Sequence, residues 1–279
     1  MIFWRPKNPV FILGCQRSGT TICEEVFRDS RQFAVFSEGS KRAMSEGYRL
    51  RDLDEIDALI ASTRKSMLMF KPLNDSHWGD RFLERWPRAR VIWIWRDVHD
   101  TVNSAVTKWG DAQRDIVYAI VDAFAGGVDR DIALARLSSY TNNGMYAERM
   151  PLADITMLAG WAKEGLSAEA GAAAVWWMRN KIFFDLELDA EPRALLVRYE
   201  DFVAQPGAEI RRICEFMGAS YKKRFASKVH AGSIRKSPPP TLPAELFAEC
   251  QSLEFRLEQA YRRQRSDESH AETRAAATT

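Results

Sequence analysis

The sequence predicts an α/β fold in which a parallel sheet lies between layers of helices. Short apolar segments recur along the chain, each bounded by turn or charged residues, and segments with helical periodicity lie between them. This alternation is typical of a three-layer architecture whose strands are buried on both faces. We predict strands at residues 10–13, 33–36, 67–70, 91–95 and 194–197.

Helical patterns fill the intervals between these strands, at residues 21–28, 52–61, 80–86, 98–109 and 206–217. From about residue 111 to 188 the alternation stops and only helix-like segments follow, which predicts a helical insertion (111–188) over an edge of the sheet. Ligands of such sheets bind beyond the carboxyl ends of the strands. The insertion therefore either closes over a substrate or serves packing alone.

The chain of 279 residues is interpreted as a single domain over residues 1–262, because α/β domains routinely reach this size. Residues 263–279 are polar and rich in alanine, with no apolar periodicity. We expect them to form a disordered polar tail.

The charges nearly cancel, with 40 basic and 38 acidic residues and a net charge of +2. This balance argues against nucleic acid or an anionic membrane as partner, so an anion site must be local. No apolar run is long enough for a membrane span and no signal-peptide pattern is evident, so we expect a cytoplasmic protein. The four cysteines lack CxxC spacing and a neighbouring histidine, which predicts free thiols rather than a zinc site.

The strongest motif is Gly-Cys-Gln-Arg-Ser-Gly-Thr-Thr at residues 14–21, between a predicted strand and a predicted helix. Gly14 and Gly19 allow backbone amides to point inward around an anion, and the helix N-terminus adds a favourable dipole. The spacing is that of a Walker A loop, but Thr20 occupies the position of the lysine that binds nucleoside triphosphates. The cation of this loop is Arg17, so the motif predicts a phosphate site poorly suited to hydrolysis of ATP or GTP.

Residues 15–21 resemble the 5′-phosphosulfate loop of sulfotransferases that use 3′-phosphoadenosine 5′-phosphosulfate (PAPS), where Lys or Arg precedes Ser-Gly-Thr-Thr. The resemblance implies a P-loop NTPase-like fold, PAPS as sulfuryl donor, 3′-phosphoadenosine 5′-phosphate (PAP) as product, and no metal. It implies that Arg17 stabilises the leaving phosphate. The residues that it assigns to the 5′ end of the cofactor are Gly14, Gln16, Arg17, Ser18, Gly19, Thr20 and Thr21.

A second motif, Arg96-Asp-Val-His-Asp-Thr-Val-Asn-Ser104, follows the strand at 91–95. An arginine at the end of a strand and a serine two helical turns later can both reach one anion. The pattern resembles the family's 3′-phosphate element, which implies that Arg96 and Ser104 bind that phosphate. We interpret Asp97 as a cap of the following helix or a partner of Arg96, rather than as a magnesium ligand.

Two later segments extend the resemblance. The stretch 195–202, with the helix at 206–217, is similar to the strand, Tyr-Glu-Asp turn and helix common in the family. Arg235 and Lys236 lie near the position of an Arg-Lys-Gly element that binds the 3′-phosphate in cytosolic members, although Ser237 replaces the glycine. They are candidates for that phosphate, and the alternative is a basic surface turn.

Transfer to a hydroxyl or amine also needs a base. Glu38 follows the strand at 33–36, where several branches of the family have an active-site glutamate; its alternative is a solvated loop acid. His77 is the rival, because the cytosolic branch uses histidine. Residues 71–77 look more like the Lys-Thr-Pro turn of bacterial and Golgi-type members, which makes Lys71 a second cation near the leaving group.

Two other functions are compatible with the sequence: a P-loop kinase or nucleotide triphosphatase, and a PAP-binding protein without transfer activity. The acceptor class is open among carbohydrate, lipid, peptide and small metabolite. The sequence does not indicate the oligomeric state.

Overall fold

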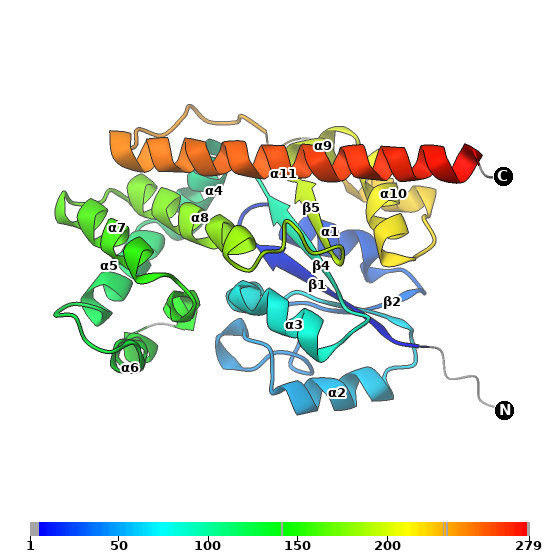
Figure 1. The fold of residues 1–279 in the computed structure, drawn as a ribbon, viewed down its shortest axis with the longest axis horizontal. Coiled ribbons are helices and arrows are strands. Elements are labelled where there is room, and N and C mark those ends of the chain that lie inside the picture. The colour runs from blue at the N-terminus through cyan, green and yellow to red at the C-terminus, as the bar shows by residue number, and fades with distance from the viewer. Residues whose placement is uncertain (1–5, 141, 231, 233, 278–279) are drawn as a thin grey trace.

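The computed structural model describes residues 6–140, 142–230, 232 and 234–277. Within them a sheet of five strands lies at the centre of the molecule (Figure 1), in the order β2-β3-β1-β4-β5. Every pair of neighbours is parallel. The predicted strands are confirmed, as β1 (Asn8–Gly14), β2 (Phe33–Phe36), β3 (Met67–Phe70), β4 (Arg90–Trp95) and β5 (Ala194–Arg198).

Helices connect the strands, and those from α5 to α8 occupy the stretch predicted as a helical insertion. The α-helices are α1 (Thr20–Arg28), α2 (Leu53–Ser62), α3 (Gly79–Arg85), α4 (Val98–Trp109), α5 (Ala112–Ala123), α6 (Arg130–Tyr140), α7 (Leu152–Lys163), α8 (Ala168–Asp185), α9 (Tyr199–Ala204), α10 (Pro206–Met217) and α11 (Ala244–Ala277). Short 3₁₀ helices are η1 (Glu46–Tyr48), η2 (Leu73–Trp78), η3 (Asn142–Glu148) and η4 (Lys223–Lys228).

The alternation of side chains along each strand creates two cores, one on each face of the sheet. Phe11 and Leu13 of β1 belong to the core that contains residues of α2, α3, α8 and α11. Val10 and Ile12 belong to the core that contains residues of α1, α9 and α10. The three layers expected from the sequence are therefore present, with the sheet as the middle one.

The prediction of a disordered tail at 263–279 needs correction, because α11 continues to Ala277. Figure 1 shows this long helix crossing the molecule beside β5. The side chain of Gln264 donates a hydrogen bond to the carbonyl oxygen of Ala194 (3.1 Å) and accepts one from the backbone N–H of Leu196 (2.8 Å). β5 is an edge strand, so polar groups of α11 satisfy backbone atoms that no neighbouring strand pairs. Residues 278 and 279 lie outside the described part.

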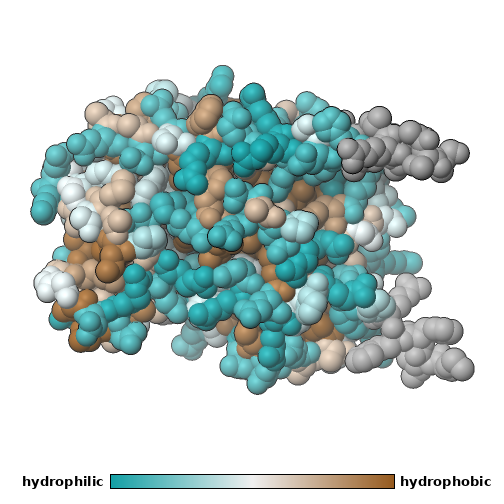
Figure 2. Space-filling view, viewed as in Figure 1, coloured by the Kyte–Doolittle hydropathy of each residue, from teal (hydrophilic) through white to brown (hydrophobic). Residues whose placement is uncertain are grey.

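Because the strands are parallel, the segments that follow β1, β2, β3 and β4 all emerge at the same edge of the sheet. The predicted phosphate loop, Glu38, Lys71 and Arg96 are on these segments. Hydrophilic residues cover most of the molecular face drawn in Figure 2. In the part of the chain that the structure describes, no helix has both the length and the hydropathy needed to cross a bilayer.

Candidate functional site

The phosphate loop packs tightly against two neighbouring elements. Gly14 has φ of 128°, and a Cβ atom there would lie 2.3 Å from the carbonyl oxygen of Ile94 in β4. Gly19 has φ of 92°, and a Cβ atom there would lie 2.2 Å from the ring of Tyr199. Glycine is therefore required at both positions, by conformation and by space. The loop leads directly into the first turn of α1, with Gly19 as the N-cap. The N–H groups of a first helical turn have no partner within the helix.

Arg17 links this loop to α4. Its Nε atom donates a hydrogen bond to Oγ of Ser104 (3.1 Å), and its guanidinium lies over the ring of Trp109, 5.6 Å from the centroid. Its carbonyl oxygen accepts a hydrogen bond from Nη1 of Arg96 (3.4 Å). Arg17 adopts a left-handed backbone with φ of 68°, which is uncommon outside glycine. The residues predicted to bind the 5′- and 3′-phosphates thus form one continuous site.

Arg96 is buried, and its position is fixed on several sides. Its Nη2 atom lies 3.2 Å from a carboxylate oxygen of Asp100, and its guanidinium lies 4.6 Å from the ring centroid of Tyr199. Asp97 caps α4 by accepting a hydrogen bond from the backbone N–H of Asp100 (3.0 Å), which confirms its interpretation as a cap. Asp100 is the ion-pair partner of Arg96.

Arg235 reaches the same region through its backbone. Its N–H lies 3.0 Å from each carboxylate oxygen of Asp100, and its φ is 49°. The side chains of Arg235 and Lys236 are exposed. The structure therefore brings this basic segment next to the ion pair of Arg96 and Asp100, although the two parts of the chain are far apart in the sequence.

Lys71 follows β3, and its side chain contacts residues of α1 and of the loop after β2. Its Nζ atom lies 3.1 Å from the carboxylate of Glu38 and 3.5 Å from that of Glu24, and it donates a hydrogen bond to Oγ1 of Thr21 (2.9 Å). The side chain of Glu24 is completely buried, that of Lys71 is 4% exposed, and that of Glu38 is 30% exposed. Glu38 is thus the one of these three charged side chains that faces solvent.

His77 lies apart from this cluster. It is completely buried, and its Nε2 atom is 3.6 Å from the carboxylate of Glu148. Burial lowers the pKa of His77, and the nearby carboxylate of Glu148 offsets part of that effect. The side chain is enclosed between η2 and η3 and does not line the cavity described below.

The sequence missed several residues that support the loop. Gln16 donates a hydrogen bond to the side-chain oxygen of Asn74 (3.1 Å), which also accepts one from the buried Arg179 of α8 (3.2 Å). The backbone N–H of Gly14 donates to Oγ of Ser76 (3.1 Å). Asn74 and Ser76 follow β3 at the carboxyl edge of the sheet, and that position was the signal that could have identified them.

A cavity of about 260 Å³ opens at the phosphate loop. It brings together several predicted residues, and it adds Tyr48 and Trp109, which the sequence did not single out. Its lining consists of Gln16, Arg17, Thr20, Thr21, Glu38, Tyr48, Leu73, Asn74 and Trp109.

The donors around this cavity are suited to anionic oxygen atoms. The same loop also carries the hydroxyl of Ser18, which is buried beside the thiol of Cys15. Arg17 lines the cavity together with Thr21, and the ammonium of Lys71 donates a hydrogen bond to Thr21. Glycine, hydroxyl and cationic groups in this arrangement fit the 5′ end of a phosphorylated nucleotide.

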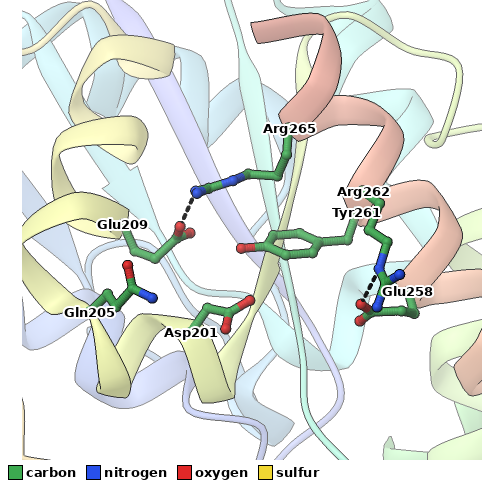
Figure 3. Close-up of a pocket in the computed structure, with 7 residues that line it drawn as sticks. All are labelled: Asp201, Gln205, Glu209, Glu258, Tyr261, Arg262 and Arg265. Carbon is green, nitrogen blue, oxygen red and sulfur yellow. Dashed lines mark hydrogen bonds and ion pairs between the residues drawn. The ribbon is translucent and has the colours of Figure 1, made fainter. Parts of the chain in front are cut away.

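A second hollow, of about 310 Å³, lies between α9, α10 and α11 (Figure 3). Its charged groups largely neutralise one another: Arg265 pairs with Glu209, and Arg262 lies 2.6 Å from Glu258. Tyr261 lies between these two pairs in Figure 3. None of the predicted site residues lines this hollow, so we place the candidate site at the phosphate loop.

Comparisons with known proteins identify the fold and the family of the chain. The chain is similar to the sulfotransferase domain from the Synechococcus PCC 7002 olefin synthase, with a TM-score of 0.51 and 15% identity over 90% of this chain and 94% of that one. It is also similar to the sulfotransferase domain from the curacin biosynthetic pathway, with a TM-score of 0.50 and 14% identity over 90% of this chain and 99% of that one. These likenesses show the fold.

A search among curated proteins gave no match. The family model of the sulfotransferase domain, however, matches residues 7–236, which include the phosphate loop, Glu38, Lys71 and the motif from Arg96 to Ser104. The chain therefore belongs to the sulfotransferase family, as its phosphate loop predicts.

Proposed function

We propose that this PAPS-dependent sulfotransferase transfers the sulfuryl group to a hydroxyl or amine, with Arg17 stabilising the leaving phosphate and Glu38 acting as base. The observation that carries the proposal is the contact of Arg17 with both Ser104 and Arg96. It connects a loop suited to a 5′-phosphate with an arginine suited to a second phosphate. A nucleotide with phosphates at the 5′ and 3′ positions of its ribose would engage both groups.

The loop and α4 would hold the two ends of the nucleotide. In this proposal Gly14, Gly19 and the first turn of α1 bind the 5′ end through backbone N–H groups, and Ser18 adds its hydroxyl. Arg96 and Ser104 bind the 3′-phosphate, and Arg235 and Lys236 cover it from outside. The exposed side chains of these last two residues leave them able to turn toward an anion.

Bound PAPS supplies the sulfuryl group: its bond from sulfur to the bridging oxygen breaks, the acceptor oxygen or nitrogen bonds to sulfur, and the acceptor proton passes to Glu38. Arg17 and Lys71 place positive charge where the bridging oxygen becomes negative. Lys71 is held there by Thr21, Glu24 and Glu38. Charge stabilisation by groups already in position requires no metal ion in this mechanism.

Glu38 fits the role of base better than His77 does. Glu38 lines the cavity at the loop and is partly exposed, so an acceptor can reach its carboxylate. His77 is completely buried beside Glu148, away from that cavity. We therefore assign His77 a structural role between η2 and η3.

Transfer of ³⁵S from labelled PAPS to a panel of acceptors tests the proposal. We expect the wild type to label an acceptor, and Arg17→Ala to lower kcat by about 10²- to 10³-fold while PAP still binds. Arg31→Ala, which removes an exposed arginine just after α1, is the matched control and should retain full activity. If Arg17→Ala transferred sulfate as fast as the wild type, the assigned role of Arg17 would be wrong. PAP binding without transfer to any acceptor would instead favour a binding protein.

A further inference from the structure

Tyr48 stands at the junction of two cavities. Its side chain is 59% exposed, and it lines both the cavity at the phosphate loop and a neighbouring cavity of about 520 Å³. Glu38 also lines both cavities. A molecule in the larger cavity could therefore present a hydroxyl to Glu38, which faces the phosphate loop on its other side.

The backbone that carries Tyr48 is strained and firmly held. Tyr48 has φ of 59°, a left-handed conformation that is rare for a bulky residue, and it follows Gly47 with φ of 75°. The buried Asn74 donates a hydrogen bond to the carbonyl oxygen of Gly47 (2.8 Å). The buried Asp75 accepts one from the backbone N–H of Leu50 (2.6 Å). Strain that surrounding groups maintain is characteristic of ligand sites, and here it holds an aromatic ring out in solvent.

Most of the side chains that line the larger cavity carry polar groups, and the size of the cavity is within the range of small-molecule sites. Apart from Tyr48, Met44 is the one large apolar side chain among its described lining residues. The polar side chains offer both donors and acceptors of hydrogen bonds, from Glu38, Ser40, Lys41, Ser45, Glu46 and Arg51.

We propose that the acceptor is a saccharide, bound in the larger cavity with the C–H face of one sugar ring against Tyr48 and one hydroxyl directed at Glu38. A sugar ring combines an apolar face, which packs on an aromatic ring, with a rim of hydroxyls that both donate and accept hydrogen bonds. The ring of Tyr48 and the polar walls match these two properties. This inference rests on the proposed function, because it uses Glu38 as the base.

Binding and transfer measured on the full chain test the inference. The probes are tetrasaccharides built from glucose, from N-acetylglucosamine and from glucuronate alternating with N-acetylglucosamine, with 4-nitrophenol and 1-dodecanol as comparison acceptors. Binding to PAP-loaded protein is followed by saturation-transfer NMR, and transfer by ³⁵S-labelled PAPS. We expect at least one saccharide to bind and become sulfated. Tyr48→Ala should raise its KM roughly three- to tenfold with little change in kcat, while Tyr48→Trp should stay close to wild type.

The outcomes separate this inference from the proposed function. Sulfation of 4-nitrophenol or dodecanol but of no saccharide would overturn the saccharide assignment and leave the sulfotransferase mechanism standing. Absence of saccharide binding to protein that binds PAP would overturn it as well, as would an unchanged saccharide KM in Tyr48→Ala. Failure to bind PAP would contradict the proposed function itself.

Discussion

The Nε atom of Arg17 donates a hydrogen bond to Oγ of Ser104, across 3.1 Å and 87 positions of sequence. Arg17 belongs to the loop after β1, and Ser104 lies two turns into α4. Because β1 and β4 are neighbours in the sheet, the segments that follow them meet at one edge. This contact joins the two predicted phosphate motifs, and the prediction for Ser104 in the next paragraph depends on that connection.

Ser104→Ala should discriminate between nucleotides that differ only in the 3′-phosphate. We expect PAP affinity to fall about tenfold, because a hydrogen bond to a charged group is lost. The affinity for adenosine 5′-monophosphate should change little. Isothermal titration calorimetry measures both constants, and Thr107→Ala, an exposed hydroxyl one turn further along α4, is the matched control. An equal loss of affinity for both nucleotides would argue against a 3′-phosphate at Ser104.

Glu38→Gln and His77→Asn should affect different properties of the enzyme. We expect Glu38→Gln to lower kcat by about 10²- to 10³-fold with an unchanged melting temperature, since Glu38 is the proposed base and its side chain is partly exposed. His77→Asn should lower the melting temperature, because His77 is completely buried, and should leave the pH dependence of kcat as it is. Burial lowers the pKa of His77, so the wild-type ring is neutral at pH 7. The opposite pattern would make His77 the base.

Lys71 and Glu24 form a buried ion pair, so the effect of replacing one on stability should depend on whether the other is present. Lys71→Met leaves the buried carboxylate of Glu24 with Arg28 as its remaining cationic partner, and we expect a loss of about 1–3 kcal/mol in the free energy of unfolding. Glu24→Gln in addition removes that charge, so the double variant should be more stable than Lys71→Met alone. Urea denaturation gives all four values of the double-mutant cycle. Additive effects would show that the two groups do not interact.

Glu254 should make stability fall as the pH rises through neutrality. Burial, with Asp97 and Glu200 nearby, raises the pKa of Glu254 from 4.5 to about 7. Between these values the folded state binds more protons than the unfolded state, so stability decreases from about pH 4.5 to 7. The backbone of Val98 and the side chain of Arg198 favour the charged form and only partly offset the burial.

Glu254→Gln removes this penalty while it keeps the shape of the side chain. We expect a gain of about 1–3 kcal/mol at pH 8 that shrinks to less than about 1 kcal/mol at pH 5, measured by urea denaturation at both values. Asp267→Asn changes an exposed carboxylate on the same helix and should give no such difference. A gain of equal size at both pH values would be incompatible with the raised pKa.

The sequence predicted the strands well because each is an apolar run flanked by turn residues, and burial on both faces leaves little ambiguity. The phosphate loop was equally clear, since Gly14 and Gly19 meet requirements that other residues cannot. The helical end of the chain was missed because its stabilising contacts are polar: Gln264 binds the edge of β5, and Glu268 lies 2.7 Å from Arg212. Apolar periodicity carries no information about such contacts.

Contacts between distant segments could not be read from the sequence either. The roles of Asn74, Arg179 and Tyr48 depend on how η2, α8 and η1 meet, and no local pattern identifies them. The cytoplasmic location, the place of the chain among the bacterial and Golgi-type members, and the assignments of individual site residues stay predictions.

Calorimetric titration of the purified protein with PAP and, separately, with ATP and magnesium tests the central claim most directly. A site that joins a 5′-phosphate loop to a 3′-phosphate arginine should bind PAP with micromolar or tighter affinity and bind ATP with magnesium much more weakly. Thr20 in place of the Walker lysine gives the physical reason for the weaker binding of the triphosphate. Tight binding of ATP with magnesium, together with no detectable binding of PAP, would contradict the account.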